Sequence, residues 1–240
     1  MQHATTAGPV DTHHFPSAAE QATALAQAVG HQLAAALQAR GQASLAVSGG
    51  RSPLAFFAAL REQALDWTRV TVTLVDERCV PAEHPDRNAR LVRLHLLQGA
   101  AAQATLVDWL PGVPDPALLA PNDLVALARA QLRRVPWPLD VAVLGMGEDG
   151  HTASWFPDSP GLAEALHGTA ALCWVRPAHA PHLRLTLTLS ALSTCRHLHL
   201  AIAGARKQQV LADALAGRTP SPPIQSLLGQ TATLQAWIAD

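Results

Sequence analysis

The chain has 240 residues, of which 49% are hydrophobic and 15% are charged. This is enough apolar sequence for one large core, and we expect a flexible segment over residues 1–16 and a single domain over residues 17–240. The formal net charge is −1 and the pI is near 6.9. This charge balance does not favour nucleic acid or an anionic membrane as a partner.

Nothing in the sequence predicts a membrane span, a secretion signal or a disulfide framework. No apolar run approaches the roughly 20 residues of a membrane-spanning helix, and the start of the chain lacks a basic segment followed by an apolar one. Cys79, Cys173 and Cys195 form no Cys-x-x-Cys pair, and the 12 histidines are scattered. We therefore expect a cytoplasmic protein without a metal site or a cofactor.

A long helix begins the expected domain. Ser17 and Glu20 match the Ser-x-x-Glu capping box, in which each side chain satisfies a backbone N–H of the other residue. The alanine-rich sequence after them predicts a helix to about Ala39. Gly41 follows and is a residue type that commonly ends a helix.

Strand, loop and helix then alternate along the chain. An apolar run at residues 43–47 precedes Ser48-Gly49-Gly50, and Pro53 falls in the first turn of the helix that follows. A β-branched run at residues 70–75 precedes helical leucine spacing at residues 87–97, and a further apolar run occupies residues 139–144.

Two more strands are expected towards the end of the chain. Residues 183–190 alternate leucine with polar residues, which predicts a strand with one polar face, and residues 197–203 predict another strand. This alternation favours a three-layer, Rossmann-like α/β fold with a mainly parallel twisted sheet and helices on both faces. In such a fold, ligands bind at the carboxyl ends of the strands.

Two of the expected strand ends carry residues that could belong to a binding site. Ser48, Gly49 and Gly50 can let backbone amides approach a phosphate closely, or they can form only a tight turn. Asp76-Glu77-Arg78 places three charges directly after an apolar strand. Such charges face a cleft, pair with one another or lie in solvent.

Residues 145–150 match the Gly-x-Gly-x-x-Gly pattern of dinucleotide-binding loops. Glu148 and Asp149 argue against that interpretation, because they would place negative charge where a pyrophosphate lies. The next expected strand ends at Val175-Arg176 rather than at an acidic residue. A nicotinamide cofactor is therefore disfavoured.

His151 is the main candidate for catalysis. Imidazole exchanges a proton near neutral pH, and a position where a loop enters a helix would favour its basic form. Asp149 would orient the ring. The alternatives are a histidine bonded only to backbone and an aspartate that only caps the turn. Because no Gly-x-Ser-x-Gly elbow occurs, water activated by a base is a simpler mechanism than attack by a serine.

Two basic residues later in the chain are candidates for binding an anionic substrate. Arg184 lies on the polar face of its expected strand, and Lys207 lies near the start of a helix that follows Gly204. Either residue alone is also typical of a solvated surface charge.

Five segments, taken in order, resemble the 6-phosphogluconolactonase family. They are SGGRSP at 48–53, VDERCVP at 75–81, LGMGEDGHTASWFP at 144–157, and the later RLTLTL and GARKQQVL. The resemblance covers nearly the whole chain after the first 16 residues. It implies the fold of the sugar-phosphate isomerases and deaminases, and hydrolysis of 6-phosphoglucono-1,5-lactone to 6-phosphogluconate in the oxidative pentose phosphate pathway.

The resemblance also implies roles for individual residues. His151 would be the base that activates water, with Asp149 beside it, and Arg78 would steady the substrate or the developing oxyanion. The residues expected to bind the phosphate and the sugar are Ser48, Gly49, Gly50, Asp76, Arg184 and Lys207. The expected partner is a small sugar phosphate, bound by a monomer or weak homodimer.

Three positions depart from the family pattern: Cys79, Trp155, and Arg87 before Asn88. We expect them to reshape the rim of the pocket. Two rival functions remain. A glucosamine-6-phosphate deaminase usually has a catalytic glutamate after the histidine and Asp-Glu-Tyr in place of Asp-Glu-Arg. A non-catalytic sugar-phosphate sensor would normally carry a DNA-binding segment, which is not found here.

Overall fold

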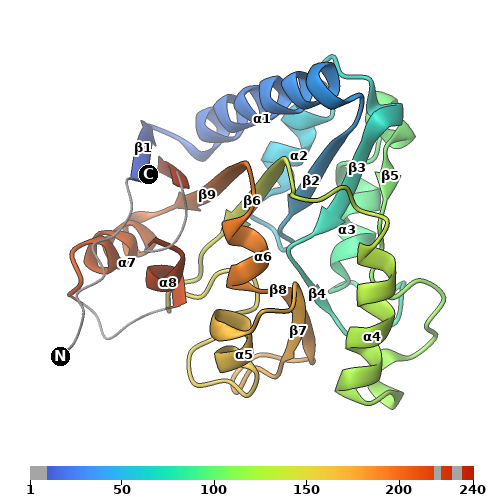
Figure 1. Cartoon of the computed structure of the whole chain (residues 1–240). Coiled ribbons are helices and arrows are strands. Elements are labelled where there is room, and N and C mark those ends of the chain that lie inside the picture. Colours follow the sequence, from blue (N-terminus) through green and yellow to red (C-terminus); the bar gives the residue numbers. More distant parts are fainter. Residues whose placement is uncertain (1–9, 219–222, 229–233) are drawn as a thin grey trace.

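A seven-stranded sheet forms the centre of the structure, a computed structural model that describes residues 10–218, 223–228 and 234–240 (Figure 1). Every strand pair in this sheet is parallel, and the order is β1-β10-β9-β6-β2-β3-β5. The strands are β1 (Val10–Phe15), β2 (Ala43–Val47), β3 (Val70–Leu74), β5 (Thr105–Leu106), β6 (Val141–Gly145), β9 (His197–Ala203) and β10 (Leu234–Ala239). The expected mainly parallel α/β fold is confirmed.

The strand order reverses direction beside β2. The chain runs outward from β2 to β3 and β5, and then returns to place β6 on the other side of β2, followed by β9 and β10. All five residues of β2 are buried, so helices and loops cover both faces of the sheet there. A reversal of this kind leaves a crevice at the carboxyl ends of the two strands on either side of it, here β2 and β6.

Helix α1 (Ala18–Arg40) begins and ends as the sequence predicts. The Ser17 hydroxyl accepts a hydrogen bond from the Glu20 N–H, and Gly41 takes the left-handed conformation at the C-terminus. The helix packs against β1, β2, β6, β10 and α2. Its buried Gln21 side chain donates to the backbone oxygens of Ile202 and Trp237, which ties the start of α1 to β9 and β10.

Shorter helices complete the structure. They are α2 (Leu54–Leu60), α3 (Asn88–His95), α4 (Pro121–Leu132), α5 (Leu162–His167), α6 (Leu189–Ser193), α7 (Ala205–Leu215) and α8 (Pro223–Leu228). Three short 3-10 helices in the described part of the chain occupy Trp67–Arg69, Gly99–Gln103 and Pro116–Leu118. Within the described residues, no helix is both long enough and apolar enough to cross a membrane.

A second, antiparallel sheet of three strands was not expected. It contains β4 (Asp76–Arg78), β8 (Arg184–Leu187) and β7 (Leu172–Val175), with β8 in the middle. The strand predicted over residues 183–190 is shorter than expected, because the Thr188 hydroxyl caps α6. Its polar face is not solvated either. Arg184 and Thr186 are buried against the segments that form the site.

The N-terminal segment also differs from its prediction. Residues 1–9 lie outside the described part of the chain, but residues 10–15 form β1, which pairs in parallel with β10. The expectation of a flexible segment is therefore wrong from Val10 onward. The stacking of His13 and Phe15 on Trp237 accompanies this pairing.

A buried ion-pair network joins β4 to the start of α3. The Arg87 guanidinium lies 3.1 Å from a Glu77 carboxylate oxygen and 2.7 Å from an Asp108 oxygen, and the Arg87 and Glu77 side chains are fully buried. Glu77 also accepts hydrogen bonds from the backbone N–H groups of Arg78, Asn88 and Ala89. Burial raises the pKa of Glu77 to about 7, while Arg87 and these N–H groups act in the opposite direction.

The three family departures lie in the interior rather than on the rim of a pocket, so that expectation is wrong. Arg87 belongs to the ion-pair network. Trp155 is fully buried, with its indole N–H donating to the Leu187 carbonyl at 2.8 Å, and Cys79 is buried in the core. None of the three lines the cavity described below.

Replacement of Arg87 by methionine is expected to destabilise the fold by roughly 3 to 5 kcal/mol, because it leaves the buried Glu77 carboxylate without its cation and Asp108 paired with Arg93 alone. The folded-state pKa of Glu77 lies above its unfolded value, so this group's contribution to stability is lost as pH rises towards 7. Without Arg87 that pKa rises further. The loss of stability should therefore be larger at pH ~8 than at pH ~5, as measured by urea unfolding.

Arg69→Ala is the matched control, because Arg69 pairs with Asp66 at the surface, where both side chains are about half exposed. Its stability should stay close to that of the wild type, because solvent screens an exposed pair. An Arg87→Met variant that is as stable as the wild type at both pH values would show that the ion-pair network does not stabilise the fold.

Candidate active site

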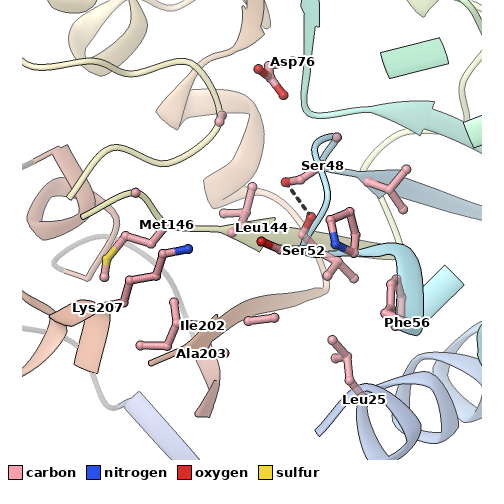
Figure 2. A pocket seen from close by; sticks show the side chains of 18 of the residues that line it. Leu25, Ser48, Ser52, Phe56, Asp76, Leu144, Met146, Ile202, Ala203 and Lys207 are labelled. Atoms are coloured by element: carbon pink, nitrogen blue, oxygen red, sulfur yellow. Dashed lines mark hydrogen bonds between the residues drawn. The ribbon is translucent and has the colours of Figure 1, made fainter. Parts of the chain in front are cut away.

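A cavity of about 520 Å³ lies at the carboxyl ends of β2, β6 and β9 (Figure 2). This is the side of the sheet on which the strand order predicts a crevice. The cavity brings together seven of the nine residues singled out from the sequence: Ser48, Gly49, Asp76, Arg78, His151, Arg184 and Lys207. Gly50 and Asp149 lie outside its lining.

His151 and Asp149 form a hydrogen-bonded pair on the loop after β6. The His151 Nδ1 lies 2.6 Å from Asp149 Oδ1, and the same oxygen accepts the His151 backbone N–H. The bond from His151 holds the pKa of Asp149 below its usual value, so the carboxylate is ionised at neutral pH. Since an ionised carboxylate can only accept, the ring donates from Nδ1, and in the neutral imidazole the lone pair is then on Nε2.

The loop carrying His151 does not enter a helix, so the expected effect of a helix N-terminus on this residue is wrong. Ala153 has a φ of 48°, a left-handed conformation that cannot continue into an α-helix, and the next helix, α5, begins at Leu162. The absence of a helix here also removes the usual pyrophosphate site of a dinucleotide-binding loop.

Backbone hydrogen bonds hold this loop in place. The Gly147 N–H donates to the His151 carbonyl, and the Thr152 hydroxyl donates to the Gly145 carbonyl. The Gly150 carbonyl accepts from the Ile224 N–H of α8. The position of the imidazole is therefore fixed by contacts from both sides of the loop.

Gly147 is required because the imidazole lies directly over its backbone. A Cβ atom at this position would lie 2.3 Å from His151 Nδ1 and Cε1, and 2.6 Å from Asp149 Oδ1. No other residue type would leave the pair where it is. By contrast, a Cβ atom on Gly145 would meet no atom within 4 Å.

Phe156 links the imidazole to one of the arginines of the cavity. Its ring stacks on His151 with centroids 4.1 Å apart, and the Arg184 guanidinium carbon lies 5.5 Å from the centre of the same ring. This arrangement restricts rotation of the imidazole. It also places a positive charge on the neighbouring aromatic surface.

The loop after β2 is held close to α3. The Ser48 hydroxyl donates to the Val143 carbonyl at 3.1 Å, so it is engaged with backbone rather than with a catalytic base. A Cβ atom on Gly49 would lie 1.8 Å from the Asn88 side-chain oxygen. Glycine is therefore needed at position 49 for the loop to pack against Asn88.

Asp76 lies in a network of polar side chains. Its carboxylate accepts from the Ser154 hydroxyl at 2.5 Å and from the Asn88 amide at 3.3 Å, and it lies 4.0 Å from an Arg184 nitrogen. Asp76 is 6% exposed. It therefore supplies the buried negative charge that partly balances Arg184.

Arg78 and Arg184 are direct neighbours across β4 and β8, where their Cα atoms are paired in register. Like charges placed opposite each other repel. Burial lowers the pKa of Arg184, and Arg78 acts in the same direction, whereas Asp76 opposes both. Each arginine also has a buried Nε that bonds to no other residue described by the structure. Both arginines line the cavity, so their positive charges suit an anionic group at this end of it.

Lys207 extends from the first turn of α7 into the cavity, and Figure 2 shows its amino group pointing towards the side formed by Ser48 and Ser52. It makes no hydrogen bond or ion pair with another residue in the described part of the chain. The wall nearest Lys207 is apolar and includes Leu144, Met146, Ile202 and Ala203.

Four residues that shape the site were not identified from the sequence: Asn88, Ser154, Phe156 and Ile224. Phe156 and Ser154 lie in the segment after His151, and Asn88 directly follows Arg87. Their positions close to these motifs could have identified them as site residues. Ile224 contacts the loop through its backbone N–H. A backbone contact of this kind leaves no trace in the sequence.

A family model described as glucosamine-6-phosphate isomerases/6-phosphogluconolactonase matches residues 16–236. The 6-phosphogluconolactonase of Pseudomonas aeruginosa is 50% identical over 202 residues, which are 83% of this chain and 83% of that protein. The 6-phosphogluconolactonase of Neisseria meningitidis is 45% identical over 221 residues, which are 90% of this chain and 93% of the relative.

Solved structures agree with this relationship. A 6-phosphogluconolactonase from Shewanella baltica has a TM-score of 0.89 and 36% identity, covering 97% of this chain and 98% of that one. A monomeric glucosamine-6-phosphate deaminase has a TM-score of 0.74 at 15% identity, covering 95% of this chain and 97% of that one. At that identity the likeness shows a common fold alone. The chain belongs to the glucosamine-6-phosphate isomerase/6-phosphogluconolactonase family, among its 6-phosphogluconolactonases.

Proposed function

We propose that this chain hydrolyses 6-phosphoglucono-1,5-lactone to 6-phosphogluconate, with His151 as the general base that activates water. The observation that carries this proposal is the set of contacts made by the His151 ring. Its Nδ1 is held by Asp149, it lines the cavity, and its Nε2 bonds to no other described residue. The proposal keeps the expectation of a cytoplasmic enzyme that acts as a monomer or weak homodimer.

The reaction needs only a proton shuttle and a site for negative charge. Nε2 of His151 takes a proton from water as the water oxygen attacks the lactone carbonyl carbon. The C–O bond to the ring oxygen then breaks, and the imidazolium returns the proton to that oxygen. Asp149 stabilises the imidazolium in between. Because the Ser48 hydroxyl is bonded to backbone, a water nucleophile fits better than a serine.

The substrate's charge is matched by the basic residues of the cavity. We assign binding of the phosphate and sugar to Arg184, Lys207 and the loop at residues 48–50, with Asp76 orienting Arg184. Arg78 is assigned to the substrate or the oxyanion. The place of both arginines in the cavity lining supports this assignment. An anion near them would relieve their mutual repulsion.

The test is the rate of acid release from freshly generated 6-phosphogluconolactone above its spontaneous hydrolysis, without added metal. Replacement of His151 by alanine is expected to lower kcat by roughly 10²- to 10⁴-fold, the usual contribution of a general base. His179→Ala removes an exposed histidine and is the control.

If the wild type does not accelerate hydrolysis, the lactonase proposal is wrong. Release of ammonia from glucosamine 6-phosphate would then identify a deaminase. Binding of 6-phosphogluconate without turnover of either substrate would identify a sensor. Full activity of His151→Ala would be compatible with lactone hydrolysis but would show that His151 is not the general base.

Asp149→Asn is expected to lower kcat by roughly 10- to 10³-fold, because the ring loses the carboxylate that fixes its tautomer and stabilises the imidazolium. KM should change little, since Asp149 does not line the cavity. Steady-state kinetics separate the two effects. A change confined to KM would show that Asp149 acts in binding instead.

Gly147→Ala is expected to displace the His151–Asp149 pair and to lower kcat as Asp149→Asn does, because its Cβ would overlap both side chains. Ring ¹⁵N chemical shifts of His151 report the geometry directly. Gly145→Ala is the matched control for these shifts, since its Cβ meets no atom within 4 Å. Unchanged shifts in Gly147→Ala would contradict the close packing.

A further inference from the structure

Three potential metal ligands meet outside the cavity, where two loops come together. His84 and Asp86 follow β4, and His182 precedes β8. One ligand atom of each residue lies within 4.8 Å of the others. The Asp86 Oδ2 lies 3.0 Å from His182 Nε2 and 4.0 Å from His84 Nδ1, and the two rings meet edge to face with centroids 5.1 Å apart.

We propose that His84, Asp86 and His182 bind a transition-metal dication, of which Zn²⁺ is the representative case. Two imidazole nitrogens and one carboxylate oxygen suit zinc, copper and nickel rather than magnesium or calcium. Zinc bonds of about 2.0–2.2 Å place tetrahedral ligand atoms roughly 3.3 Å apart. The Asp86–His182 pair is already near that separation, and the His84 nitrogen, 4.0 Å from Asp86 Oδ2, has to move closer to both.

All three ligands are available to solvent and to a metal. Their side chains are 34%, 47% and 25% exposed for His84, Asp86 and His182. The His84 Nδ1 accepts the Asp86 backbone N–H at 3.1 Å. It therefore carries a lone pair, which a metal can take in place of this hydrogen bond.

The backbone at His182 has an uncommon conformation. Its φ is 72°, in the left-handed region that residues other than glycine rarely occupy. Such a conformation costs free energy and persists where the surrounding structure or a ligand holds it. Here it occurs at the residue whose ring faces Asp86 across the two loops.

A charge nearby moderates the expected affinity. Arg78 donates to the Asp86 carbonyl at 2.7 Å, and its positive charge opposes binding of a dication. This hydrogen bond connects the cluster to the cavity, because Arg78 lines the cavity. A second connection is the hydrogen bond that Arg184 donates to the Pro181 carbonyl at 3.3 Å, next to His182. A bound metal would therefore join the two loops that hold Arg78 and Arg184.

Isothermal titration of the chelator-treated full chain with Zn²⁺ tests the proposal, and the absorption bands of bound Co²⁺ report tetrahedral coordination. Loss of either imidazole ring, in His84→Ala or His182→Ala, is expected to weaken zinc binding by at least roughly tenfold. Loss of a residue that only supports a metal ligand already costs about this much affinity. His179→Ala removes an exposed histidine three residues from His182 and should bind as the wild type does.

A wild-type chain that takes up no Zn²⁺ below ~1 mM overturns the proposal. Unchanged affinity in both histidine variants also overturns it, because the metal would then bind elsewhere, for example at His151. Zinc should raise the Tm of the wild type and not that of His182→Ala. If His182→Ala does not fold, Asp86→Asn serves as the second variant with the same expected loss. These readouts do not depend on lactonase activity.

Discussion

The buried carboxylate of Glu77 is the interaction on which the geometry of the site depends. It lies between β4 and the start of α3, where three backbone N–H groups and Arg87 surround it. A carboxylate without these partners would be costly in the interior, so the two segments meet in one arrangement. That arrangement fixes Asn88, which contacts Asp76 on one side and the backbone of Gly49 on the other.

The same strand places Arg78 opposite Arg184, an arrangement that costs stability in the absence of ligand. Asp76 offsets part of this cost but lies 4.0 Å from Arg184, too far for a strong hydrogen bond. An anionic substrate would supply the missing negative charge. In this view the protein holds the arginines in unfavourable proximity, and part of the substrate's binding energy comes from relief of their repulsion.

The sequence was sufficient to predict the parallel sheet and most of the residues around the cavity, because strand periodicity and local motifs are visible along the chain. It was insufficient where tertiary contacts decide. The leucine alternation at residues 183–190 is real, but two residues of its polar face are buried, Thr186 against Ser154 and Arg184 near Asp76. Arg87 was expected at the rim because it departs from the family pattern, and its buried pairing was missed because its partners, Glu77 and Asp108, are distant in sequence.

His151 illustrates the difference between identifying a residue and predicting its environment. The motif was enough to single it out, yet the predicted helix is absent, and the ring is oriented by Asp149, Phe156 and the bare backbone of Gly147. Hydrogen bonds from β6 and α8 fix this loop without any ligand. The free energy needed to order the proposed base is therefore met during folding, which leaves the substrate's binding energy for the transition state.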